Sequence, residues 1–156
     1  MNRGLFATVL PLLALVSACS GSPPAAAPVD VAAIEKAAHG GYVYRYSADL
    51  SKREGEGKAG KDTVWVQPPG TPAVGMAFVD AYERLGDAYL LEAARETGEC
   101  LIRGQLHSGG WDASIEFDPE TRKRHAYRVD GSPAKRARNN TSFDDQKTQA
   151  AVSMLM

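Results

Sequence analysis

Residues 71–105 have the sequence TPAVGMAFVDAYERLGDAYLLEAARETGECLIRGQ and decide the fold. Thr71 and Pro72 are typical of an N-cap and first helical position, because the missing N–H of proline is not needed there and its fixed φ suits a helix start. Apolar residues then recur at helical spacing until Gly86, which provides a left-handed exit. Asp87 caps a second helix directly afterwards. Two helices joined by so short a turn are expected to pack antiparallel.

Shorter segments surround this predicted helical hairpin. Aromatic and β-branched residues favour extended structure in residues 42–46 and 63–67. The charged, glycine-rich residues 51–62 between them predict a loop. Residues 113–117 and 125–129 flank an Asp-Pro turn, and we expect them to pair as a small β-hairpin.

A last helix is expected to begin near Thr141 or Ser142, because each lies three residues before an aspartate in a capping-box-like pattern. This helix runs to Met156 and ends on apolar side chains, with neither a glycine exit nor a charged last turn. An uncapped apolar helix end normally has another element packed on it. We therefore expect the chain to be the N-terminal fragment of a longer protein.

The N-terminal residues indicate secretion. A short positive segment precedes an apolar run at residues 5–16, which is shorter than the roughly 20 residues of a transmembrane helix. The following Val-Ser-Ala-Cys19 resembles the lipobox of bacterial lipoproteins. That resemblance implies a lipid anchor on Cys19, and Ser20 in place of an aspartate favours the outer membrane. The alternative is an ordinary secretory signal that ends in this tetrapeptide by chance.

We therefore divide the chain into a signal peptide at residues 1–18, a tether rich in proline and alanine at 19–29, and one domain at 30–156. Asp30 is expected to cap a short helix over residues 31–38.

The overall charge balance argues against nucleic acid as a partner, because 18 Lys and Arg face 19 Asp and Glu among 156 residues. Two cysteines exclude a disulfide scaffold, and we interpret Cys100 as a free, half-buried thiol. Residues 121–138 are locally basic, with seven Lys and Arg against one Asp. Within this stretch Arg136 and Arg138 are candidate contacts for a uronate carboxylate, since arginine forks match that group. The alternative is a solvated loop.

The segment Gln105-Leu-His-Ser-Gly-Gly-Trp111 has the pattern Gln-x-x-x-Gly-x-Trp at a helix end. The glutamine amide is suited to bonding exposed helix-end carbonyls while it lies on the indole. We interpret Trp111 as structural and Trp65 as the better exposed candidate for stacking on a sugar ring. The pattern resembles the repeat of α/α toroids, which include terpene cyclases, prenyltransferase subunits and several polysaccharide lyases.

Three segments narrow this resemblance: residues 81–90 (AYERLGDAYL), 104–111 (GQLHSGGW) and 141–145 (TSFDD). Their order resembles the pectic acid lyases of polysaccharide lyase family ten, in which a Tyr-x-x-x-Gly-Asp helical hairpin leads to Gly-Gly-Trp and then to a Thr-Phe-Asn-Asp type motif. The resemblance covers about residues 64–156. It implies a mainly α fold, here a partial α/α toroid, and calcium-assisted β-elimination of polygalacturonate with an arginine as the base.

One family motif has no counterpart here. The family carries an acidic Thr-Ile-Asp-Asn-like motif before the helix that precedes Gly-Gly-Trp, whereas residues 65–71 read WVQPPGT. The catalytic arginine of the family would lie beyond Met156. The resemblance thus implies Asp145, with Asp144 beside it, as the calcium ligands of this chain. The alternative is that both carboxylates only complement a helix dipole.

Three functions follow from these observations. The first is a surface-anchored lyase acting on an acidic polysaccharide, an enzyme if the full-length protein carries the catalytic arginine. The second is a non-catalytic carbohydrate-binding or scaffold lipoprotein of the same fold. The third is a terpene-cyclase-like toroid, which the lipid anchor disfavours.

Overall fold

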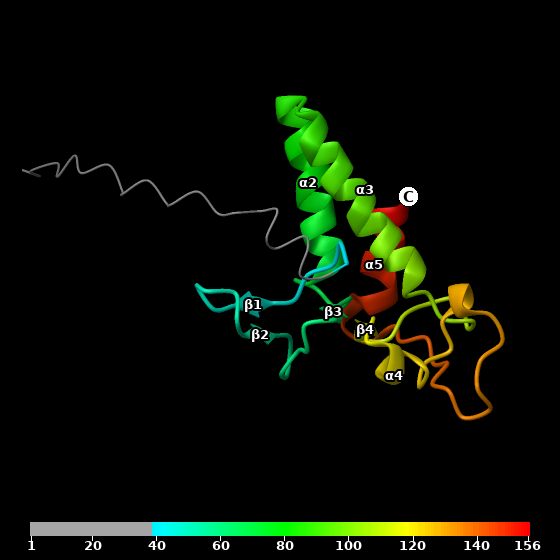
Figure 1. The fold of residues 1–156 in the computed structure, drawn as a ribbon. Coiled ribbons are helices and arrows are strands. Elements are labelled where there is room, and N and C mark those ends of the chain that lie inside the picture. The colour runs from blue at the N-terminus through cyan, green and yellow to red at the C-terminus, as the bar shows by residue number, and fades with distance from the viewer. Residues whose placement is uncertain (1–38) are drawn as a thin grey trace, which may run out of the picture.

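The computed structural model describes residues 39–156 (Figure 1). Helices α2 (Thr71–Leu85) and α3 (Ala88–Arg103) are the longest elements; they lie side by side and extend away from the remaining described chain. Helix α5 (Lys147–Leu155) packs near their base. Helices are thus the larger elements, accompanied by two small sheets. The predictions for the signal peptide, the lipid anchor on Cys19, the tether and the helix at 31–38 lie outside the described residues.

The predicted helical hairpin is confirmed. Gly86 ends α2 with φ of 70°, and the Asp87 side chain accepts a hydrogen bond from the Tyr89 backbone N–H at 3.0 Å. The predicted N-cap of α2 is wrong, because Gly70 occupies that position without a side-chain cap. The buried Thr71 hydroxyl instead binds the backbone N–H and carbonyl of Tyr42, at 2.9 and 3.1 Å. It therefore ties the N-terminal segment to the helix base.

Each sheet has two antiparallel strands. Strand β1 (Arg45–Tyr46) pairs with β2 (Arg53–Glu54), so the predicted loop at 51–62 contains a short strand. Strand β3 (Thr63–Trp65) pairs with β4 (Ser114–Glu116) across the helical hairpin.

The predicted hairpin between residues 113–117 and 125–129 is wrong. The first of these segments pairs with β3, as described above, and α4 (Pro119–Arg122) follows it. The cause is local, because the Asp118 carboxylate accepts hydrogen bonds from the backbone N–H groups of Glu120 and Thr121. Asp-Pro therefore starts a helical turn here rather than a strand reversal.

The last helix begins later than predicted. A 3-10 turn, η2 (Asp144–Gln146), precedes α5, and no side chain caps either element. The Thr141 hydroxyl accepts from the Gly110 backbone N–H at 3.0 Å instead of capping a helix. This contact joins the Gly-Gly-Trp turn to the segment before α5.

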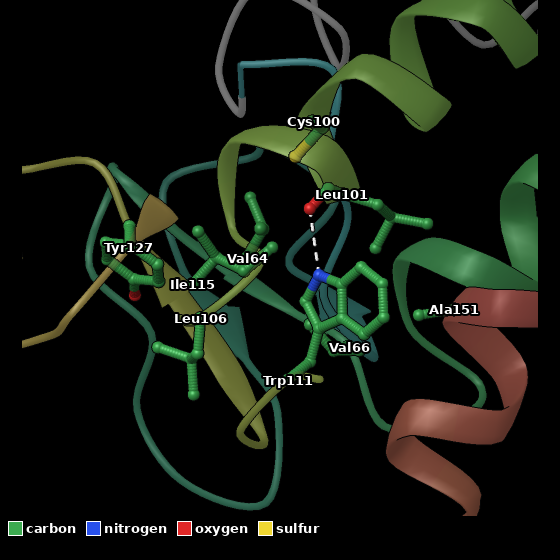
Figure 2. Packing of buried hydrophobic residues seen from close by; sticks show 9 residues of the cluster. All are labelled: Val64, Val66, Cys100, Leu101, Leu106, Trp111, Ile115, Tyr127 and Ala151. Atoms are coloured by element: carbon green, nitrogen blue, oxygen red, sulfur yellow. Dashed lines mark hydrogen bonds between the residues drawn. The ribbon is translucent and has the colours of Figure 1, made fainter. Parts of the chain in front are cut away.

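The hydrophobic core forms around Trp111, which is 1% exposed (Figure 2). Its indole N–H donates to the Leu101 carbonyl at 2.8 Å, near the end of α3. The Gln105 amide donates to the Gly109 carbonyl at 2.8 Å. The corner predicted from the Gln-x-x-x-Gly-x-Trp pattern is thus confirmed, but tryptophan rather than glutamine bonds the helix-end carbonyl. Other members of the core are Val64, Val66, Cys100, Leu106, Ile115, Tyr127 and Ala151.

Cys100 is free, as predicted, but it is fully buried rather than half-buried. Burial raises the pKa of its thiol to about 12. The thiolate is the reactive form of cysteine, so Cys100 should be inert while the protein is folded.

We expect the Cys19→Ser variant to show no reaction of Cys100 with a thiol reagent at pH 8 in native buffer, and one full equivalent in denaturant. A Cys100→Ala variant on the same background controls for reagent side reactions. Rapid labelling of Cys100 in native buffer would contradict its burial in the hydrophobic core.

Candidate functional site

The candidate site forms where the loop after β2, the end of β3 and the turn before α5 meet. The Gln67 side-chain amide nitrogen lies 2.9 Å from Glu56 Oε1 and 3.3 Å from Asp145 Oδ2. One amide therefore bridges two carboxylates, one of them 78 positions away in the sequence. The resemblance indicated Asp145 at this site, whereas Gln67 and Glu56 were not among the predicted site residues.

Gln67 is 8% exposed and has a defined backbone position. Its carbonyl accepts from the Gly70 N–H at 2.9 Å, and the preceding Val66 N–H donates to Ala113 at 2.8 Å. The Gln67 side-chain oxygen is buried and finds no hydrogen-bond partner among residues 39–156. In this orientation the amide nitrogen donates to both carboxylates, whereas a half-turn of the amide would place its oxygen there and leave room for a cation between the three oxygen-bearing groups.

Lys147 places a cation beside the carboxylates. Its ammonium nitrogen lies 3.6 Å from Asp145 Oδ2 and 3.9 Å from Asp144 Oδ2, and the residue is 9% exposed. The carboxylates of Asp144 and Asp145 thus share one ammonium group, and Glu56 adds a further negative charge beside the Gln67 amide.

Asp145 and Gln146 have left-handed backbone conformations, with φ of 47° and 58°. Such conformations cost of order 1–3 kcal/mol each and persist where the surroundings hold them. The Asp145 carboxylate points to the Gln67 amide, and no side chain caps α5. Asp145 therefore makes a long-range contact in addition to lying just before this helix.

Tyr44 and Trp65 flank the cluster. The Tyr44 hydroxyl and the Trp65 indole nitrogen are both buried. The pKa of Tyr44 is raised, first by burial and then by the negative charge of Glu56, with a smaller contribution from Asp145, while its contact with the Trp65 side chain lowers it.

Trp65 is less accessible than predicted for a sugar-stacking residue. A Cβ atom built on Gly55 would lie 2.2 Å from the Trp65 ring, so the glycine backbone covers one face of the indole. The Tyr44 ring meets it edge-on, with ring centroids 5.9 Å apart. Trp65 is half-buried, with its ring between Gly55 and Tyr44.

Arg136 and Arg138 are exposed, and no contact within residues 39–156 joins either side chain to Asp145. The backbone of Arg138 exchanges hydrogen bonds with Arg124 and Ala126, at 2.7 and 2.8 Å. The predicted basic contacts therefore belong to a separate region of the described chain.

The sequence gives unequal indications of the three site residues that were not predicted, Gln67, Glu56 and Lys147. Gln67 stands in the segment that replaces the acidic motif of the family, so its place was visible although its role was not. Glu56 lies in the glycine-rich segment predicted as a loop, and nothing in the sequence connects Lys147 to either. Residues 39–156 contain no group of three His, Cys, Asp or Glu side chains suited to a metal.

Comparisons of the chain with protein-family models, curated proteins and solved structures find no match. No helix in the described range is long and apolar enough to cross a membrane. Any function must therefore be argued from the site itself.

Proposed function

We propose that this protein acts on an acidic polysaccharide of the polyuronate class, as a lipid-anchored member of an α/α toroid lyase type. Glu56, Gln67 and Asp145 would hold a calcium ion that receives a uronate carboxylate. The observation that carries the proposal is the buried Gln67 amide held between two carboxylates from distant parts of the chain.

The donor set suits calcium, because this hard cation takes carboxylate and amide oxygens at flexible geometry. Glu56 and Asp145 offer carboxylates, and a half-turn of the Gln67 amide adds its oxygen. Calcium takes about 6–8 oxygen ligands, so three from the chain leave positions for water and for substrate. Bound calcium would draw electrons from the uronate carboxylate and acidify the C5 proton.

In a β-elimination the C5 proton leaves to a base, a double bond forms between C4 and C5, and the C4–oxygen bond breaks. Glu56 and Asp145 would position the uronate, and Lys147 would limit the repulsion between the carboxylates. The base of the resembled family is an arginine, and we assign that role to no residue of the described range.

A non-catalytic binding protein of the same fold is the second candidate. The observation that favours it is Gln67, which stands where the resembled family carries carboxylates. A neutral amide holds calcium less strongly than a carboxylate, and weaker binding of the cation would suit capture of polymer better than turnover.

The substitution Asp145→Asn in the full-length protein tests the site. We expect wild-type protein to gain thermal stability with calcium and to yield an ultraviolet-absorbing unsaturated product from polygalacturonate. The variant should lose both responses, because one of two carboxylate ligands is gone. Without calcium it should be as stable as wild type or slightly more so, since a repulsive charge has been removed.

The exposed Asp80 in α2 gives a matched control, and Asp80→Asn should keep both responses. If calcium stabilises the wild-type protein but no unsaturated product forms from polygalacturonate, the protein is the non-catalytic binding protein of the second candidate function. If Asp145→Asn keeps its calcium response and costs about 1 kcal/mol of stability in calcium-free buffer, Asp145 is only a helix-end residue and the proposal fails.

A further inference from the structure

A pocket of about 530 Å³ opens between α4 and the loop that begins at Asp130. The loop is part of the orange segment in Figure 1. This volume lies within the range of small-molecule sites. Arg122, Lys123 and His125 line one part of it, and Asp130, Ser132 and Ala134 line another.

The pocket has a fixed wall. The Arg122 guanidinium binds the Asp130 carboxylate at 2.7 Å and the Arg103 carbonyl at 2.8 Å. It also lies 4.3 Å from the centre of the Tyr127 ring. The next loop residue, Gly131, is held by a 2.8 Å contact between its carbonyl and His107 Nε2. The loop is thus tied to the core before any ligand arrives.

Lys123 is the donor at this wall of the pocket, and the His125 ring lies beside it. The His125 ring stacks on Tyr127 with centroids 5.3 Å apart, and its buried Nδ1 has no hydrogen-bond partner in the described chain. Burial lowers the pKa of His125, and the positive charge of Arg138 lowers it further. Among residues 39–156 the Lys123 ammonium pairs only with the exposed Glu120, and exposed pairs of this kind contribute little.

The surroundings attract anions. Five further cations of residues 121–138 have no ion-pair partner within residues 39–156: Arg124, Arg128, Lys135, Arg136 and Arg138. Asp130 in the wall would repel a phosphate dianion, whereas its oxygens and the Ser132 hydroxyl suit sugar hydroxyls. Pro119, Pro133 and Ala134 add apolar surface against which a sugar ring can lie.

We infer that this pocket binds one hexuronate unit, with its carboxylate toward Lys123 and His125 and its hydroxyls toward Asp130 and Ser132. The choice of sugar acid rests on the proposed function, but the pocket needs no calcium. It would hold the polymer at a point separate from the Glu56, Gln67 and Asp145 cluster.

Calorimetric titration of the full-length protein with digalacturonate, in buffer containing a calcium chelator, tests this inference. We expect saturable binding, and none with a neutral disaccharide of the same size. Lys123→Gln should weaken binding about tenfold, as expected for the loss of one charged hydrogen bond. Ala134→Trp should weaken it at least as much by filling the pocket without changing charge.

Lys52→Gln is the matched control, because this exposed lysine lies outside the pocket, and it should bind as wild type does. Far-ultraviolet circular dichroism verifies that each variant is folded. Binding that appears only with calcium would be assigned to the Asp145 cluster and would overturn the inferred binding in this pocket. This conclusion does not depend on whether the calcium proposal itself is correct. Binding of inorganic phosphate or a short oligonucleotide as tight as that of digalacturonate also overturns it, and so does a folded Ala134→Trp variant with wild-type affinity.

Discussion

Replacement of Trp111 by alanine is expected to lower the free energy of unfolding by about 3–5 kcal/mol, the usual cost of removing a large buried aromatic side chain. Trp111 is 1% exposed at the centre of the core, so the truncation leaves a cavity. It also removes the indole N–H that bonds the Leu101 carbonyl at 2.8 Å near the end of α3. Single domains have about 5–15 kcal/mol of stability in total, so a large part of it should be lost.

Urea denaturation followed by far-ultraviolet circular dichroism measures this effect. Trp111→Phe fills most of the volume but leaves the Leu101 carbonyl without its donor, which should cost about 1–3 kcal/mol. Leu85→Ala is the control, since Leu85 is 75% exposed at the tip of the helical hairpin and should change stability by about 0.5 kcal/mol or less. Equal losses for Trp111→Ala and Leu85→Ala would show that Trp111 does not organise the core.

The helical hairpin was predictable because its signals are local. Gly86 and Asp87 end one helix and start the next through their own backbone and side chain, and neither depends on distant residues. Thr71 and Thr141 resemble caps in the sequence as well. Both are drawn away by long-range contacts, Thr71 to Tyr42 and Thr141 to Gly110. A hydroxyl that ties two segments together has the same local sequence as one that caps a helix.

Strand pairing was harder to predict, because it also depends on contacts between segments that are distant in the sequence. Residues 63–67 and 113–117 were both predicted as extended, but their pairing across the intervening helices follows from the core and not from neighbouring residues. Ile115 and Val64 are opposite one another in this sheet, and both are fully buried. The nearby Asp-Pro turn suggested that residues 113–117 pair with residues 125–129, and this pairing does not form.

The candidate site shows the limit of motif reasoning. Asp145 could be named because a motif surrounds it, whereas Glu56 lies in a glycine-rich segment that resembles a simple loop. Gln67 follows a short strand and precedes two prolines, a context without chemical meaning until Asp145 is placed beside it. The three residues become a site only through contacts between distant segments.

Gln67→Glu is expected to change stability in opposite directions with and without calcium. In calcium-free buffer the introduced carboxyl would lie in a position that is 8% exposed, between Glu56 and Asp145, and would lose the hydrogen bonds that the amide donates. We expect the free energy of unfolding to fall by about 2 kcal/mol or more.

The loss of stability in Gln67→Glu should depend on pH, because it comes from burying an ionised carboxyl beside two like charges. Burial and two like charges raise the pKa of the introduced carboxyl in the folded state above its unfolded value. A raised folded pKa makes the protonated form the favoured one, so the penalty is present at neutral pH and shrinks as the pH falls through the folded pKa. Thermal unfolding at pH 7 and pH 5 should therefore show a smaller difference from wild type at the lower pH.

Calcium should reverse the order of the two proteins. Three carboxylates bind this cation more tightly than two carboxylates and an amide, and a ligand at 100 times its dissociation constant adds about 2.7 kcal/mol of stability. The rise in melting temperature with calcium should thus be larger for Gln67→Glu than for wild type, and absent for Gln67→Leu, which offers no oxygen. If calcium stabilises all three proteins equally, the cluster holds no cation, and the Gln67 amide serves only to separate two carboxylates.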